Sequence, residues 1–186
     1  NTFTDRAKGN VVVDGLLRLA SGIINFMGIG FAGGGVAEGT LSAGSMDMNG
    51  HSITSLQVGV STTGQATGSL SVGGGDLNAG MVLVGNTSTG SADGRIALTG
   101  VAMTATNVLA GTSTGGGAAM AHLVLNSSVA TVLEDFSLQS GELALDRSLL
   151  SVGDEFRLGS NAGLRLALDG VNRGSEYGAI DTLLAF

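Results

Sequence analysis

The sequence of 186 residues contains no cysteine. This absence excludes disulfide bonds, thiolate chemistry and metal sites that use cysteine ligands. A chain without cysteine also suits passage through an oxidising compartment such as the bacterial periplasm. Any stable fold must therefore rest on apolar burial and hydrogen bonding.

Proline is absent too, whereas the chain has 33 glycines. Turns normally use both residues, so Gly, Asn, Asp, Ser and Thr must form the turns here. The lack of proline and of a strict Gly-X-Y period excludes a collagen triple helix. Hydrophobic residues make up 43% of the chain and charged residues only 12%, which argues against intrinsic disorder.

Positive charge and long apolar runs are also scarce. Lys8 is the only lysine and the formal net charge is −7, which argues against binding to the phosphate backbone of nucleic acid. The most apolar run, residues 23–32, is far shorter than a membrane span of about 18–20 residues. The first residues, NTFTDRAKG, lack the pattern of a signal peptide, so we expect any export signal to have been removed or omitted from this sequence.

The chain does contain an internal repeat. Residues 57–74 match residues 83–100 after a shift of twenty-six positions, and the glycines and apolar residues keep their places. The aligned apolar pairs include Leu70/Ile96, Val72/Leu98, Leu77/Met103 and Leu83/Leu109. From residue 121 onward a spacing of twenty aligns other pairs, such as Phe136 with Phe156. Periods of this size are typical of stacked units that each cover the apolar face of the next.

The repeat predicts an all-β fold: a parallel β-helix, or β-solenoid, of about seven coils with short strands and glycine-rich turns. We expect strands at residues 40–43, 52–60, 69–72, 81–84, 95–98 and 107–110. Residues 16–27 also have apolar residues at helical spacing, but their glycines favour strands. A globular β-sandwich, in which the repeat reflects only turn chemistry, is the alternative fold.

We divide the chain into residues 1–38, an apolar segment that caps the solenoid or joins subunits, and residues 39–186, the repeat domain. An open solenoid end exposes strand edges and core residues. We therefore expect apolar residues near both chain ends to join copies of this chain into an oligomer or filament. These residues are Val11, Val12, Val13, Leu16, Leu17, Ile23, Ile24, Phe26, Leu183, Leu184 and Phe186.

Two glycine motifs resemble catalytic or cofactor fingerprints. Residues 28–33 fit G-x-G-x-x-G and residues 111–115 fit G-x-S-x-G. Both fingerprints need a helix immediately afterwards, but more glycines follow each motif. We interpret both as bends, and expect no catalytic residues and no cofactor.

Metal and ice binding have weak signals. His51 and His122 are the only histidines and have no cluster of acidic neighbours, so we expect no zinc site. Residues 73–76 match half of a calcium-binding nonapeptide, but only once. Hydroxyl triplets at 61–63, 87–89 and 112–114 each precede a glycine, and we interpret them as solvated turns rather than an ice-binding face.

A carbohydrate-active enzyme or carbohydrate-binding module on the same scaffold is the alternative function. Such proteins place clustered acids on one face of the coil. Convergence of Asp146, Asp154, Glu155 and Arg157 in one groove would favour this alternative. Aromatic side chains that stack on sugars are scarce, with six Phe, one Tyr and no Trp.

Several segments resemble the β-solenoid passengers of secreted bacterial proteins. They are GSLSVGG at 68–74, VLVGN at 82–86, GRIALTG at 94–100 and GSEYGAI at 174–180. The last is similar to a closing G-x-x-Y-x-x-L segment, with Ile180 at the leucine position. The chain thus resembles autotransporter-type adhesins and autotransporter-associated β-strand repeat proteins, some of which carry PEP-CTERM sorting tails.

This resemblance covers about residues 39–186 and implies an extracellular or cell-surface location, a structural or adhesive role and no catalytic residues. Surface polysaccharide is a further candidate partner. This resemblance, together with the repeat and the apolar ends, leads us to expect a non-enzymatic building block of a cell surface or filament.

Overall fold

The computed structural model of the chain describes residues 6–18 and 24–182. In this part of the chain all regular structure is β, and no helix is long and apolar enough to cross a membrane. The strands are β1 (Arg6–Arg18), β2 (Ile24–Ala32), β3 (Val36–Asp47), β4 (Ile53–Ser61), β5 (Gln65–Val72), β6 (Gly75–Val84), β7 (Ser91–Thr99), β8 (Val101–Ala110), β9 (Ala118–Asn126), β10 (Val129–Val132), β11 (Phe136–Asp146), β12 (Leu149–Val152), β13 (Phe156–Leu166) and β14 (Ala179–Thr182).

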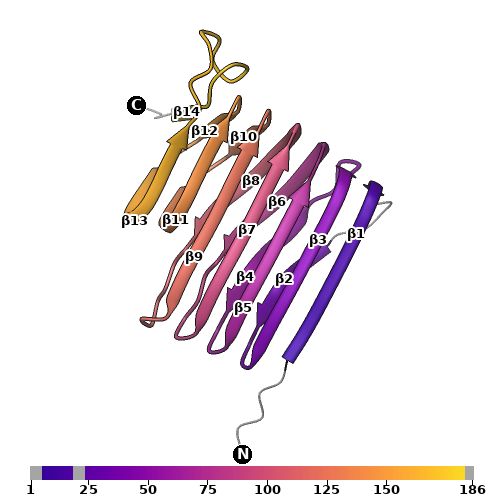
Figure 1. Cartoon of the computed structure of the whole chain (residues 1–186), viewed down its shortest axis with the longest axis vertical. Helices are drawn as coiled ribbons and strands as arrows, with labels where there is room; N and C mark the ends of the chain where they lie inside the picture. The colour runs from indigo at the N-terminus through magenta and orange to yellow at the C-terminus, as the bar shows by residue number, and fades with distance from the viewer. Residues whose placement is uncertain (1–5, 19–23, 183–186) are drawn as a thin grey trace, which may run out of the picture.

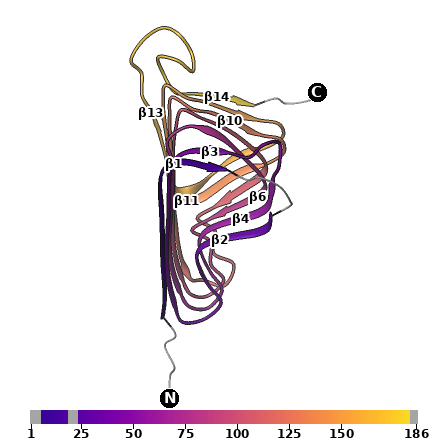
Figure 2. The same ribbon diagram turned by 90° about the vertical axis from the view of Figure 1, so that its right-hand side faces the viewer.

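The strands stack in parallel into three sheets that enclose the main core (Figures 1 and 2). Ala32, Ala37 and Ala66 form a small separate buried cluster. The front sheet contains β1, β3, β5, β7, β9 and the second halves of β11 and β13. The top sheet contains the first halves of β6 and β8, then β10, β12 and β14. The back sheet contains β2, β4, the second halves of β6 and β8, and the first halves of β11 and β13.

This arrangement confirms the predicted parallel β-solenoid rather than a β-sandwich. It makes about six turns, close to the seven coils expected. The residues aligned by the repeat are strand neighbours: Leu70 pairs with Ile96 and Val72 pairs with Leu98. In the later coils Phe136 pairs with Phe156, and their rings stack with centroids 5.2 Å apart.

The coils shorten toward the carboxyl end, because the later coils lack a narrow extension that the earlier coils form below the core. Front-sheet partners are 29 residues apart between Val36 and Gln65, but only 20 apart between Leu123 and Leu143. The longer coils extend below the core as a narrow foot, formed by the turns at 33–35, 62–64, 85–90 and 111–117 (Figure 2). The hydroxyl triplets lie in or next to these stacked turns, but Ser61 and Thr87 are buried and not solvated as expected. Backbone hydrogen bonds such as Thr89 N to Thr62 O (3.0 Å) connect successive coils.

A seam of glycines separates the foot from the core. In the back sheet, four glycines have φ between 60° and 63°: Gly30, Gly59, Gly85 and Gly111. In the front sheet, Gly39, Gly68 and Gly94 face the first three of these, and Gly111 faces the backbone of Ser140. A Cβ atom on Gly68 would lie 2.1 Å from Gly59 N, so the two backbones touch and no side chain fits between them. The motif at 28–33 thus contains a seam glycine at the end of β2.

Buried serines satisfy backbone groups at the corner between the front and top sheets. Ser148 Oγ accepts a hydrogen bond from Ser128 N at 3.0 Å and donates one to Asp146 O at 2.8 Å. Ser128 Oγ accepts from Val101 N at 3.1 Å. Successive coils are thereby connected where the chain turns away from regular strand pairing.

Candidate assembly surfaces at the ends of the solenoid

Both ends of the solenoid present unpaired strand edges. At the amino-terminal end, β1 pairs only with β3 and β2 only with β4 among the described strands. At the other end, β13 pairs only with β11 and β14 only with β12 within the same described set (Figure 1). An unpaired edge offers a row of N–H and C=O groups to a further strand.

The apolar residues expected to mediate assembly gather at the amino-terminal end. On β1, Val11, Val12 and Leu16 are 54%, 60% and 54% exposed. On β2, Phe26 is 49% exposed. Val13, Leu17 and Ile24 are partly buried. The other expected residues, Ile23, Leu183, Leu184 and Phe186, lie outside the described part of the chain.

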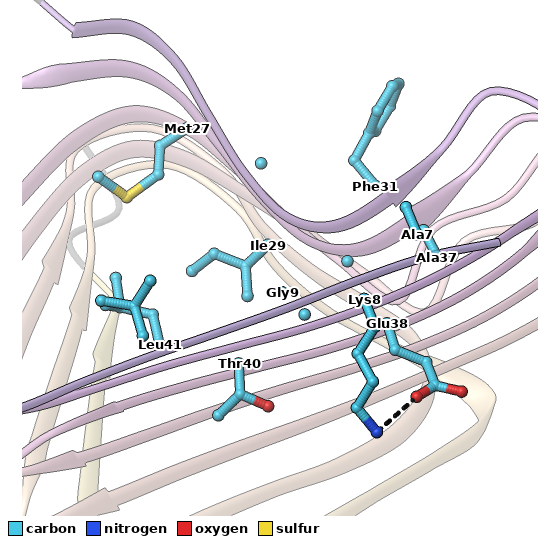
Figure 3. Close-up of a pocket in the computed structure, with 14 residues that line it drawn as sticks. Ala7, Lys8, Gly9, Met27, Ile29, Phe31, Ala37, Glu38, Thr40 and Leu41 are labelled. Atoms are coloured by element: carbon cyan, nitrogen blue, oxygen red, sulfur yellow. Dashed lines mark ion pairs between the residues drawn. The ribbon is translucent and has the colours of Figure 1, made fainter.

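A groove of about 450 Å³ opens between β1, β2 and β3. We call it the end groove; its apolar lining includes Ala7, Val11, Met27, Ile29, Phe31 and Leu41. The close-up shows Met27 and Ile29 on one side of β1 and the Lys8–Glu38 ion pair on the other (Figure 3). The groove is therefore an opening into the apolar interior, with charge confined to the outer surface beside it.

The end groove exists because the back sheet is offset from the front sheet. A Cβ atom on Gly30 of β2 would contact β5, and the Cβ of Gly39 in β3 would contact Gly30, so β2 lies across β3 and β5. β4 likewise lies across β5 and β7. No described back strand lies across the inner face of β1, and a Cβ atom on Gly9 would meet nothing within 4 Å.

The described residues before residue 38, in β1 and β2, belong to the same stack of strands. Ala7, Gly9 and Val11 pair in register with Ala37, Gly39 and Leu41, and the boundary drawn at residue 38 falls inside β3. The fixed repeat spacing of 26 residues does not identify the inner face of β1, which includes Ala7 and Gly9. The signal that locates it is the pattern Ala-x-Gly-x-apolar, which recurs at 7–11, 37–41, 66–70 and 92–96.

Ion pairs attach the outer face of β1 to β3. Glu38 contacts Arg6 at 2.7 Å and Lys8 at 3.1 Å. The hydrogen bonds and positive charge of these two partners, Lys8 first, lower the pKa of the Glu38 carboxyl below its ordinary value. Arg18 pairs with Asp47 at 3.1 Å near the other end of β1.

These ion pairs predict that acid loosens β1. Because the folded-state pKa of Glu38 is lowered, its contribution is present above the ordinary pKa of 4.5 and is lost as the pH falls through the folded value. Hydrogen exchange, corrected for intrinsic rates, should show weaker protection at residues 7–11 at pH 3 than at pH 6. In Glu38→Gln, protection should already be weak at pH 6 and change less with pH. An acid response equal to that of the wild type would contradict the assignment to Glu38.

The opposite end of the solenoid also exposes apolar side chains. Leu158, Leu164 and Leu166 of β13 are 38%, 41% and 38% exposed. Leu164 continues an inward-facing column in which it pairs with Leu143, which pairs with Leu123. The loop at 167–178 rises beyond the strand ends in both views instead of crossing this end (Figures 1 and 2). Within the described residues, β13 therefore presents both an open edge and exposed apolar side chains.

A second groove, of about 530 Å³, lies on the back sheet. It contains two of the four residues whose convergence would favour carbohydrate chemistry, Glu155 and Arg157. Its lining includes Asn107, Glu134, Asp135, Glu155 and Arg157. Asn107 Nδ2 donates to Glu134 Oε2 at 2.7 Å, and Asp135 N donates to Asn107 Oδ1 at 3.1 Å. Glu155 and Arg157 form an ion pair.

The four residues that would favour carbohydrate chemistry do not all meet in this groove. Asp146 lines a different groove beside Arg165, and Asp154 lines neither. Among the described residues, no group of three or more His, Cys, Asp or Glu side chains is placed to hold a metal ion. His122 lies in β9 between Arg95 and Glu142 of the neighbouring strands.

Comparisons of the chain with models of protein families, with curated proteins and with solved structures found no match.

Proposed function

We propose that the protein is a non-enzymatic structural or adhesive subunit that builds a bacterial cell surface or an extracellular filament by joining its open ends. One observation carries this proposal: each end of the solenoid has both an unpaired strand edge and exposed apolar side chains. Edge strands of soluble proteins are usually shielded by charges, bulges or a covering segment. Here residues 6–13 of β1 pair with β3 without a bulge, and the charges of Arg6 and Lys8 are held by Glu38 on the outer face. Val11 and Val12 remain exposed.

The surface location rests on the sequence. The chain has no cysteine and few charges, and four of its segments are similar to autotransporter-type passengers and autotransporter-associated β-strand repeats. A β-solenoid is the fold that this resemblance implies. Within the proposal, the long sides of the rod are free to contact surface polysaccharide while the ends join subunits.

Imaging by electron microscopy across a range of concentrations, together with sedimentation velocity, tests this role. We expect rods at low concentration and filaments at high concentration, because assembly buries apolar area at both ends. Val11→Asp places a charge on the inner face of β1 and should abolish filaments. The matched control is Ser71→Asp, an exposed position of β5 away from both ends, which should still assemble. Discrete rods at every concentration would overturn the proposal.

Carbohydrate binding by the back-sheet groove is the second candidate function. The groove combines amide and carboxylate groups with the apolar side chains of Met81 and Leu109, which is a lining suited to a sugar. Titration with oligosaccharides should then give saturable binding that Asn107→Ala weakens at least tenfold. Equal binding by the variant would exclude this groove as the site.

A further inference from the structure

We propose that two copies join head to tail as a continuation of the solenoid, in which the second half of β13 of one copy pairs in parallel with β1 of the next. This inference rests on the proposed self-assembly and specifies its interface. The strand pairing and side-chain contacts in this joint would be of the same kind as those between neighbouring coils of one chain.

The inward-facing columns fix the register of the joint. Val11 begins a column that runs through Leu41, Leu70, Ile96, Leu123, Leu143 and Leu164. A parallel column that begins at Val13 ends at Leu166. Continuing both columns places Leu164 beside Val11, and Leu166 beside Val13, of the next copy. Val11 and Leu164, which are 54% and 41% exposed, then cover each other.

Charges on the outer face are compatible with this register. The same continuation places Arg165 beside Val12 and Asn161 beside Lys8, so no like charges face each other. Pairing two copies of β1 with each other is less favourable, since β1 carries Arg6, Lys8 and Arg18 against one acidic residue, Asp14. The distribution of charge thus favours unlike ends, and a joint between unlike ends propagates into an open filament.

Disulfide trapping tests the register, because the chain has no cysteine of its own. Neighbouring strands lie about 4.8 Å apart, within the Cα separation that a disulfide spans. The double variant Val12→Cys/Arg165→Cys should therefore give a ladder of covalent oligomers under mild oxidation, which reduction removes. Both side chains are exposed, so thermal unfolding of the reduced variant should match that of the wild type.

The matched control moves one cysteine by two residues on the same face. In Val12→Cys/Gly163→Cys the Cα atoms would be about 8 Å apart, given a rise of about 3.3 Å per residue, and too far for a disulfide. We expect at least tenfold less oligomer, and no more than dimer from either single-cysteine variant.

The outcomes separate this joint from the proposed function. Filaments in the microscope without in-register trapping, or with equal trapping in the control, would overturn the joint and leave the structural role standing. Trapping without filaments at any concentration would support the joint and overturn the role as a filament subunit. Absence of both filaments and trapping would overturn both.

Discussion

Leu98→Asp is expected to unfold the protein. Leu98 is 1% exposed and stands in the inward-facing column between Val72 and Leu125. A carboxylate there has no partner and loses its hydration, which costs several kcal/mol. Small domains are stable by only about 5–15 kcal/mol, and this coil also supports the coils on both sides. Circular dichroism should show loss of the β signal and of a cooperative thermal transition.

Thr99→Asp provides the control for charge alone. Thr99 is the next residue of β7 and is exposed, so the same substitution should leave the fold intact. Where Leu98→Asp yields no protein, Leu98→Ala should unfold cooperatively with a loss of about 2–5 kcal/mol. A folded, cooperative Leu98→Asp protein would show that Leu98 does not face the core.

Gly68→Val is expected to have the second large effect, because the seam leaves no room for a side chain. A Cβ atom on Gly68 would lie 2.1 Å from Gly59 N and 2.2 Å from Ile29 O, and both are backbone atoms that cannot rotate away. Relieving these contacts requires the front and back sheets to separate. We expect a loss of more than about 3 kcal/mol in urea unfolding, above the usual cost of overpacking a core.

Gly9→Val is the matched variant at the same repeat position. Gly9 and Gly68 belong to one inward-facing column of the front sheet. A Cβ atom on Gly9 meets no atom within 4 Å, so the valine should change the free energy of unfolding of the monomer by less than about 0.5 kcal/mol. Equal destabilisation by the two valines would mean that the cost comes from the strand conformation and not from the seam.

The fold from residue 57 onward could be predicted because the spacing between equivalent residues is constant over long stretches. A shift of twenty-six aligns Leu70 with Ile96, and a shift of twenty aligns Phe136 with Phe156; the registers confirm both. Parallel stacking in register places equivalent residues in one column, so a conserved spacing translates directly into strand neighbours. The alternation of apolar and polar residues then identifies the inner face.

β1 could not be predicted as a repeat strand from a constant spacing, because its distance to the next equivalent strand differs. Ala7, Ala37, Ala66 and Ala92 form one column, but they are 30, 29 and 26 residues apart. A comparison at one fixed shift loses this alignment, since loop turns absorb insertions without disturbing the strands. The pattern Ala-x-Gly-x-apolar survives the change and identifies β1 as a repeat strand.

The end groove could not be predicted from spacing at all. It depends on how far the back sheet is displaced relative to the front sheet, and that displacement is set by contacts such as those of Gly30 with β3 and β5. Such contacts are between backbone atoms of different sheets. The sequence shows the glycines that permit them, but several arrangements of two sheets are compatible with the same glycines.

The loss of the foot in the later coils makes the two ends of the rod unequal in outline. Seven front strands at about 4.8 Å give a subunit length of about 34 Å, and the foot lines only the part of this length with longer coils. A fibre of joined subunits would therefore be corrugated, with the foot interrupted once in every subunit. Because the foot lies nearer one end of each subunit, the corrugation would give such a fibre a visible direction.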